Sequence, residues 1–308
     1  MSQVQPRKRG RRGWWVLVAV GALALLVVGL FVLNGLVLAD RHAPRMRHFA
    51  DVTAAPTRSQ PGEVTFVSYN IAKGFAHKGG LKFESREFVL AKLRRMAAVI
   101  RAEQPDVVFL SEALTELAPC NIDQVAFLAR ECGLPHTATG ENYNVGLPFA
   151  RVVGGNAILS RAPLTPVANI DLAGRKPLWV TQNNRRALFA SAEFGGQTVL
   201  LTALHNDSFD MRNNAAQTQQ LLDYVGDRPA VLAGDFNNRP ENRSIQLIRA
   251  TGKFAGEFEG APTFFEGTRA ERIDYIFAPG AWVLIESRVV ADDTSDHRPL
   301  VCRFKVRG

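Results

Sequence analysis

The sequence predicts an α/β sandwich, in which two packed sheets carry helices on their outer faces, preceded by one N-terminal apolar helix. Predicted strands outnumber predicted helices along most of the chain, and hairpins alternate with longer crossovers that contain a helix. The hydrophobic fraction of 46% with 21% charged residues is typical of a globular protein rather than a disordered one.

The first 60 residues carry most of the net charge of +8. They hold nine Lys and Arg and two Asp and Glu, whereas the rest of the chain holds 28 basic and 27 acidic side chains. The folded part is therefore nearly neutral. This is a weak argument against a non-specific DNA-binding protein, because such proteins usually present a basic face.

An uncharged stretch over residues 14–39 follows five basic residues within positions 7–12. At about 1.5 Å per residue, a helix of this length exceeds a hydrocarbon core of roughly 30 Å. The two tryptophans at its start lie where an interfacial aromatic belt would be. The positive-inside rule makes residues 1–13 a basic cytoplasmic tip and residues 14–39 a transmembrane helix, with everything after Ala39 outside the cytoplasm.

A cleaved signal peptide is the alternative to a retained anchor, since Val37 and Ala39 form an acceptable cleavage site. The apolar region of a signal peptide is about 7–15 residues long, and this one is much longer. We therefore expect a single-pass protein of the cell membrane. Three prolines predict a linker over residues 40–62, and residues 63–308 form the folded domain.

The three cysteines permit one short disulfide outside the cytoplasm. Cys120 and Cys132 could close a loop across one predicted helix, and the sequence leaves this open. Cys302 alternates with apolar residues on a predicted strand, which is typical of a core position. No Cys/His spacing indicates zinc.

From residue 63 the hydrophobic pattern predicts the elements in order. Apolar residues at helical spacing predict helices, and short apolar runs between turn residues predict strands. Gly195-Gly196 between two strands predicts a hairpin. The predicted strands are Val64–Asn70, Asp106–Ser111, Asn156–Ser160, Ala187–Phe194, Gln197–Ala203, Ala230–Gly234, Ile273–Ala278, Val283–Val290 and Leu300–Val306, and the predicted helices are Arg86–Gln104, Ile122–Cys132, Asn213–Val225 and Arg243–Ala250.

Polar clusters follow or flank several of these strands, in the pattern that phosphodiester hydrolysis requires. A catalyst must neutralise anionic charge, deprotonate a water and stabilise the leaving oxygen. Carboxylate and amide oxygens suit a hard cation such as Mg²⁺, and Asn70, Glu112 and Asp296 supply them. Asp235 and Asn237 lie two apart after a strand, so both point to one face, the first as base and the second as hydrogen-bond donor.

Two histidines and an arginine pair complete the candidate site. Asp274 could orient His297 by accepting a hydrogen bond from its ring. His205 follows a strand and could donate to the phosphate. Arg185-Arg186 could bind a phosphate or form a solvated pair. Trp179 and Phe264-Phe265 could line a substrate groove or pack in the core.

From about Val64 to Val306 the chain resembles the endonuclease/exonuclease/phosphatase superfamily, the DNase I-like fold. The motifs that carry the resemblance stand in the family's order, namely Ser68-Tyr69-Asn70, Glu112, Gly155-Asn156-Ala157-Ile158-Leu159-Ser160-Arg161, His205, Gly234-Asp235-Phe236-Asn237, Ile273-Asp274-Tyr275 and Ser295-Asp296-His297. The resemblance implies a four-layer α/β/β/α sandwich and phosphoester hydrolysis that depends on Mg²⁺, with Mn²⁺ as an alternative.

The resemblance also implies roles for the residues of these motifs. Asn70 and Glu112 would bind the metal with Asp296 near it, Asp235 and Asn237 would act on the attacking water, and Asp274–His297 and His205 on the phosphate. Arg186 and Asn156 are further candidates for the phosphate. The chain departs from the family pattern at Ser111, where Gln is usual, and at Ala203-Leu204, where Asn-Thr is usual before the first histidine.

These observations predict a membrane-anchored, extracytoplasmic, Mg²⁺-dependent phosphodiesterase. Nuclease activity on nucleic acid and hydrolysis of a phospholipid or sphingomyelin head group both remain open, because fold does not determine substrate. The third alternative is a catalytically inactive domain that binds phosphorylated ligands. The sequence shows no feature that indicates a protein partner.

Overall fold

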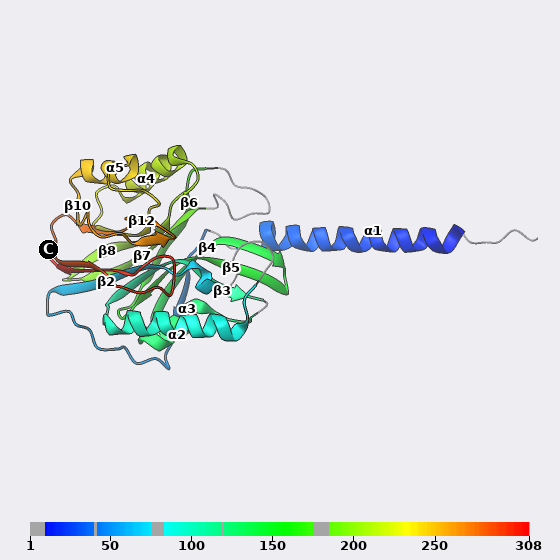
Figure 1. The fold of residues 1–308 in the computed structure, drawn as a ribbon, viewed down its shortest axis with the longest axis horizontal. Coiled ribbons are helices and arrows are strands. Elements are labelled where there is room, and N and C mark those ends of the chain that lie inside the picture. Colours follow the sequence, from blue (N-terminus) through cyan, green and yellow to red (C-terminus); the bar gives the residue numbers. More distant parts are fainter. Residues whose placement is uncertain (1–9, 40–41, 76–82, 119, 175–184, 308) are drawn as a thin grey trace, which may run out of the picture.

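Two β-sheets pack face to face, and helices cover the outer face of each, so the domain is a four-layer α/β/β/α sandwich (Figure 1). The computed structural model describes residues 10–39, 42–75, 83–118, 120–174 and 185–307. One N-terminal helix projects from one end of the sandwich. The predicted fold class is confirmed.

The first sheet has seven strands. In order across the sheet they are β1 (Arg45–His48), β4 (His136–Leu147), β5 (Ala150–Ser160), β3 (Val107–Leu117), β2 (Glu63–Asn70), β15 (Leu300–Lys305) and β14 (Val283–Val289). Helices α2 (Arg86–Ala102) and α3 (Gln124–Cys132) bury their apolar faces against it. Ser85 and Asp123 cap these two helices by accepting backbone N–H bonds.

The second sheet has six strands. Their order is β10 (Phe254–Gly256), β13 (Asp274–Pro279), β9 (Ala230–Asp235), β8 (Gln197–His205), β7 (Arg186–Phe194) and β6 (Thr165–Asp171). Helices α4 (Met211–Val225) and α5 (Arg243–Thr251) cover its outer face. A small ribbon of β11 (Phe264–Glu266) and β12 (Arg269–Glu271) stands apart, and a 3₁₀ turn, η2 (Ala72–Phe75), follows β2.

Aromatic side chains fill the space between the sheets. Phe66 from β2 contacts Phe109, Phe304 and Trp282 at ring-centroid distances of 5.8, 6.0 and 6.3 Å. All four are buried, and together with aliphatic residues of both sheets they form the central core. This core holds the sheets in a fixed relation, so that the strand ends of both sheets can build one site.

Several elements differ from the predicted ones. Strand β4 lies in a stretch rich in Thr, Asn and Gly that has no apolar run, and β3 and β5 extend well beyond their predicted bounds. Strand β1 lies within the stretch 40–62 predicted as a linker and pairs with β4. Each of the three cysteines, all within the described residues, is buried and free, so the disulfide left open by the sequence is not formed.

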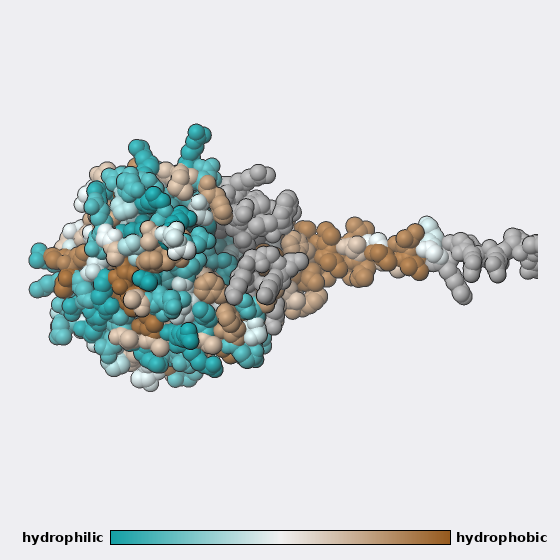
Figure 2. All heavy atoms as spheres, in the orientation of Figure 1, coloured by the Kyte–Doolittle hydropathy of each residue, from teal (hydrophilic) through white to brown (hydrophobic). Residues whose placement is uncertain are grey.

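The N-terminal helix consists of α1 (Gly10–Val32) and a π-helical turn, η1 (Leu33–Leu38). Residues Gly13–Leu38 are long and apolar enough to cross a membrane, with a mean hydropathy of 3.1. Figure 2 shows this segment as an apolar rod beside a largely hydrophilic domain. A signal sequence would pass the same test of length and composition.

Candidate active site

The polar residues at the ends of four strands meet at one end of the sandwich. The parallel pair β8–β9 places His205 opposite Asp235, and antiparallel β13 places Asp274 on the other side of Asp235. In the first sheet, the parallel pair β2–β3 ends with Asn70 opposite Ser111. The two sheets are joined here by a 3.0 Å hydrogen bond from Asn70 Nδ2 to Asp235 Oδ2.

These strand ends open into a cavity of about 710 Å³. Seven of the residues predicted for the site line it, namely Asn70, Glu112, His205, Asp235, Asn237, Asp296 and His297. Lys73, Arg185 and Phe264 also line it, and Phe209 and Met211 lie at its mouth with exposed side chains. A concave site with convergent polar groups is the arrangement typical of an active site.

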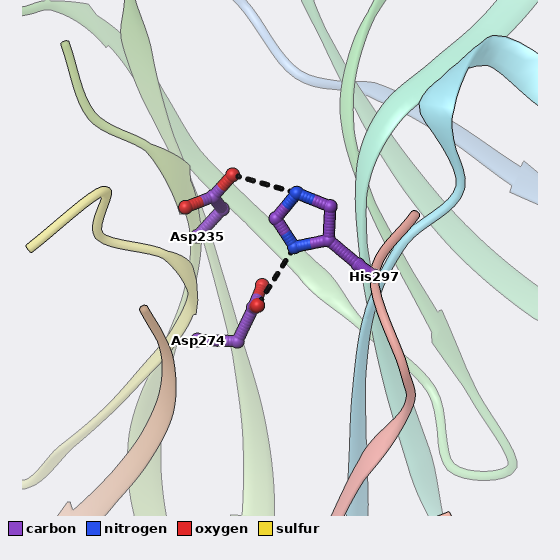
Figure 3. A group of neighbouring side chains, drawn as sticks. All are labelled: Asp235, Asp274 and His297. Atoms are coloured by element: carbon purple, nitrogen blue, oxygen red, sulfur yellow. Dashed lines mark hydrogen bonds and ion pairs between the residues drawn. The ribbon is translucent and has the colours of Figure 1, made fainter. Parts of the chain in front are cut away.

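His297 connects two buried carboxylates (Figure 3). Its Nδ1 lies 2.8 Å from Asp274 Oδ2, and its Nε2 lies 3.6 Å from Asp235 Oδ2. Burial disfavours the charged imidazolium, but the carboxylates of Asp274 and Asp235 outweigh burial and raise the pKa of His297 to about 10. His297 is therefore a cation near neutral pH, with Nδ1–H donating to Asp274.

The buried carboxylate of Asp235 has polar neighbours on several sides. It accepts hydrogen bonds from Asn70 Nδ2 and, at 2.9 Å, from the backbone N–H of Asn237. Burial, and then repulsion by Asp274, raise the pKa of Asp235 to about 7, against the opposing effects of His297 and these hydrogen bonds. A carboxylate with a pKa near neutrality is suited to general-base catalysis.

His205 lies on the other side of Asp235, with its Nε2 3.4 Å from Asp235 Oδ2 and its Nδ1 3.8 Å from Glu112 Oε1. Burial, and then the nearby guanidinium of Arg185, hold the pKa of His205 well below its usual value. The ring is therefore neutral. It can accept a hydrogen bond at one nitrogen and donate from the other.

Glu112 reaches the cavity because the backbone of β3 is irregular at this point. The register of β3 against β5 shifts between Leu110 and Ala113, and Glu112 has a left-handed φ of 55°. A bulge of this kind re-aims a side chain, and a non-glycine residue with positive φ carries backbone strain. The strained backbone conformation therefore belongs to Glu112, a residue that lines the cavity.

The carboxylate of Glu112 pairs with the ammonium of Lys73, which follows β2 in η2. Burial opposes ionisation of Glu112, but the ammonium of Lys73, with a smaller effect from Arg185, overcomes it and lowers the pKa to about 2. Glu112, Asp296 and Asn70 line one cavity, and the amide oxygen of Asn70 also accepts a 3.0 Å hydrogen bond from the backbone N–H of Ala72, which leaves it one further lone pair. This donor set is of the type that Mg²⁺ prefers.

A second group of acidic and histidine side chains has a spacing that a metal ion could use. Ligand atoms of Asp235, Asp274 and His297 all lie within 4.8 Å of one another. Figure 3 shows that these atoms contact each other, with both ring nitrogens of His297 directed at carboxylates. The arrangement is that of a hydrogen-bonded acid–base pair with a neighbouring base, so the set around Glu112 is the better candidate for the metal.

Two predicted phosphate contacts lie away from the cavity lining, as the described residues define it. Asn156 is buried, and its Nδ2 donates to the carbonyl oxygen of Arg186 at 2.8 Å. Arg186 is also buried, where it pairs with Asp171 and donates to the carbonyl oxygen of Asn169 at 3.1 Å. The Asn156 contact joins the two sheets, whereas the Arg186 side chain joins β7 to the edge strand β6 of its own sheet.

Arg185 and Lys73 line the cavity near Glu112, and Arg239 and Arg269 line it farther out. The arginine pair in the sequence indicated Arg185, although it did not distinguish it from Arg186. Nothing in the sequence indicated Lys73. Phe264 lines the cavity, with its ring 4.9 Å from that of His297, whereas Phe265 packs against Arg298. Trp179 lies outside the described residues.

The fold and the site together define a class of protein, the α/β/β/α sandwiches in which an Asp–His pair, a second Asp and further acidic and amide side chains meet in one cavity. The sequence matches the endonuclease/exonuclease/phosphatase family over residues 67–297. The chain belongs to this family, whose members are generally metal-dependent phosphoester hydrolases. A comparison with curated proteins finds no match.

Solved structures share the fold. An endonuclease/exonuclease/phosphatase from Beutenbergia cavernae DSM 12333 is 24% identical, with a TM-score of 0.61 over 80% of this chain and 72% of that one. A family protein from Leptotrichia buccalis C-1013-b is 16% identical, with a TM-score of 0.59 over 79% and 100%. The D. rerio protein TDP2, complexed with single strand DNA product, is 17% identical, with a TM-score of 0.56 over 79% and 99%.

Proposed function

We propose that the chain is a membrane-anchored, extracytoplasmic phosphodiesterase that depends on Mg²⁺ and uses Asp235 as its base. One observation carries the proposal. Asp235 lies between His205 and the His297–Asp274 pair and is held from the opposite sheet by Asn70 at 3.0 Å, in the same cavity as Glu112. Structural relatives that act on phosphoesters, including TDP2 with its DNA product, support this reaction class.

In this proposal Asp235 takes a proton from the attacking water. The backbone N–H of Asn237 and the side chain of Asn70 fix the orientation of the carboxylate. Asn237 has a left-handed φ of 49°, and its Nδ2 donates to the carbonyl oxygen of Asn206 at 3.0 Å. These contacts hold the amide at the cavity, where its remaining polar atoms can position the water.

The imidazolium of His297 stabilises the negative charge that develops on the phosphate, and Asp274 fixes its ring orientation and protonation. His205 is neutral and offers a hydrogen bond to a second phosphate oxygen. Arg185 adds a half-buried positive charge close to Glu112 and Asp235. Together these groups complement an anionic transition state.

The residues that would hold Mg²⁺ are Asn70, Glu112 and Asp296. When bound, the cation supplies charge neutralisation at the phosphate oxygens. The lowered pKa of Glu112 is consistent with this, because the ligand must be ionised. Lys73 pairs with the same carboxylate and would share or exchange it with the metal.

The proposal implies four segments, namely a cytoplasmic tip over residues 1–13, a membrane helix over 14–39, a connecting segment over 40–62 and a catalytic domain over 63–308.

The purified full chain in detergent should hydrolyse bis(p-nitrophenyl) phosphate with Mg²⁺, and EDTA should stop the reaction. A panel of plasmid DNA, RNA, sphingomyelin and inositol phosphates would then identify the substrate. Binding of phosphorylated ligands without turnover of any diester would instead indicate an inactive binding domain.

A further inference from the structure

Strand β4 contacts the N-terminal helical segment and also lines the cavity. Asn34 is the one buried residue of η1, and its Nδ2 donates to Asn144 Oδ1 at 2.8 Å and to the carbonyl oxygen of Gly146 at 3.1 Å. Asn142 and Tyr143, which directly precede Asn144 on β4, line the cavity. The helix is therefore fixed to the same strand that forms one wall of the candidate active site.

The length of the helix sets the depth of this contact in a membrane. From Gly13 to Asn34 a helix rises about 32 Å at roughly 1.5 Å per residue, which is close to a hydrocarbon core of roughly 30 Å. If the helix spans the bilayer from its basic end, Asn34 lies at the opposite surface. Asn144 and Gly146 must lie at that surface with it, because they are hydrogen-bonded to Asn34.

The end of the sandwich that holds the cavity is also the end to which the N-terminal helix is attached. Strand β2 ends at Asn70, but β3 continues to Leu117, which pairs with Val152 on β5. The β4–β5 hairpin thus overshoots the catalytic residues and turns near the root of the helix (Figure 1). Phe149 at its tip is 77% exposed.

The cavity mouth itself carries apolar side chains. Phe209 is 68% exposed and Met211 46% exposed, and both line the cavity. Exposed apolar residues around a polar catalytic pocket are typical of a surface that contacts lipid. Two arginines also line the cavity, but Arg239 and Arg269 both pair with Glu271, which offsets part of their charge. Beyond residue 60 the chain as a whole is nearly neutral, and this adds a weak argument against a nucleic-acid substrate.

We infer that the substrate is the phosphodiester head group of a lipid in the same membrane that holds the anchor. This inference rests on the proposed phosphodiesterase activity and names its substrate class. The helix acts as an orienting device, because the Asn34 contacts hold the cavity mouth at the bilayer surface. A lipid in that leaflet can enter the cavity with its head group first. A stiff nucleic-acid duplex would instead clash with the membrane surface.

The test uses the full chain reconstituted in vesicles that contain phosphatidylcholine or, separately, sphingomyelin. Release of choline or phosphocholine is compared for lipid in the same vesicle and lipid in separate vesicles. Because tethering raises the effective substrate concentration, we expect the rate to be higher by roughly tenfold or more in the same vesicle. Bis(p-nitrophenyl) phosphate, which is soluble, reports the chemical step independently of orientation.

Two variants separate orientation from chemistry. Asn34→Leu keeps an apolar span but removes the hydrogen bonds to β4, and Phe149→Ser changes one exposed side chain at the hairpin tip. Each should lower lipid hydrolysis in the same vesicle by roughly tenfold while hydrolysis of the soluble diester changes by less than about twofold. Val283→Ser is the matched control, since Val283 is 39% exposed and pairs with Lys305 at the opposite end of the sheet.

The outcomes are distinct. If the wild-type chain hydrolyses the soluble diester but neither lipid, or cleaves DNA faster than lipid, the lipid inference is overturned and the phosphodiesterase proposal stands. An unchanged lipid rate in both variants would also overturn it. If no diester is hydrolysed at all, the proposed function fails and this inference fails with it.

Discussion

The Nδ1 atom of His297 lies 2.8 Å from Asp274 Oδ2 while its Nε2 lies 3.6 Å from Asp235 Oδ2, so a single imidazole connects two buried carboxylates. The two carboxylates repel each other, and the imidazolium attracts both. The protonation of each group therefore depends on the others. This coupling makes the triad testable through its pH dependence.

In the Asp274→Asn variant, we expect both limbs of the kcat/KM profile to move to lower pH. After burial, repulsion by Asp274 is the largest effect that raises the pKa of Asp235, so its loss lowers the pH at which the base becomes ionised. Asp274 is also the largest attraction that raises the pKa of His297, so its loss lets the imidazolium deprotonate at lower pH. The measurement is kcat/KM for bis(p-nitrophenyl) phosphate across both limbs.

A suitable control for this variant is Asp292→Asn. Asp292 accepts a hydrogen bond from Tyr69 at 2.7 Å, and it is not among the described residues that line the cavity. Its profile should match that of the wild type in both limbs. An alkaline limb that stays in place in Asp274→Asn would show that Asp274 does not hold the proton of His297.

Asp235→Asn and His297→Ala should each lower kcat by roughly 10³-fold or more, the scale expected for a positioned catalytic group. Because both groups act on one transition state, the double variant should be little worse than the poorer single variant. The binding constant for substrate, measured by single-turnover kinetics, should change little. Near-full activity of Asp235→Asn would show that Asp235 is not the base and that residues Gly234–Asn237 form a turn without a catalytic role.

Glu112→Gln should abolish activity at low Mg²⁺ while the domain stays folded, because hard-cation binding requires the ionised carboxylate. Glu116→Gln is the matched control. Glu116 lies on the same strand but pairs with Arg151 at 2.6 Å, at the outer part of β3. Activity is measured against Mg²⁺ concentration, with the melting temperature as the check on folding. A normal Mg²⁺ dependence in Glu112→Gln would show that Glu112 does not bind the metal.

Sequence patterns predicted the strand ends of the site because apolar runs and the polar residues after them are local features. The predicted strands that end near Asn70, His205 and Asp235 are present, and the structure brings these residues into one cavity. Strand β4 was not predicted, because its residues are mainly small or polar and owe their strand conformation to pairing on both sides with β1 and β5.

The finer contacts of the site depend on geometry that no local pattern encodes. Glu112 faces the cavity through a bulge and a left-handed backbone conformation, and Lys73 reaches it from a turn that also has positive φ. Arg185 and Arg186 are adjacent in sequence, yet only the placement of the start of β7 within the second sheet decides which of them faces the cavity. Such relations arise from tertiary packing.

The orientation of the chain in the membrane gives the last prediction. Five basic residues precede the apolar span, so the positive-inside rule places that end in the cytoplasm and Gly308 outside. A reporter enzyme that is active only outside the cytoplasm should be active when fused after Gly308, and one that works only in the cytoplasm should be inactive there. The matched control is the same fusion lacking residues 13–39, which should reverse both results.

The same fusion tests whether the helix is retained. Asn34 is hydrogen-bonded to Asn144 and Gly146, so the end of the helix is part of the folded structure of the domain, a role that a cleaved leader would not fill. We therefore expect the fusion to sediment with membranes and to resist extraction by high salt, because an apolar span is held by the hydrocarbon and not by charge. Cytoplasmic reporter activity would contradict the orientation. Recovery of a soluble form that begins at Asp40 would contradict the anchor, and with it the mechanism by which Asn34 fixes the cavity mouth at the bilayer surface.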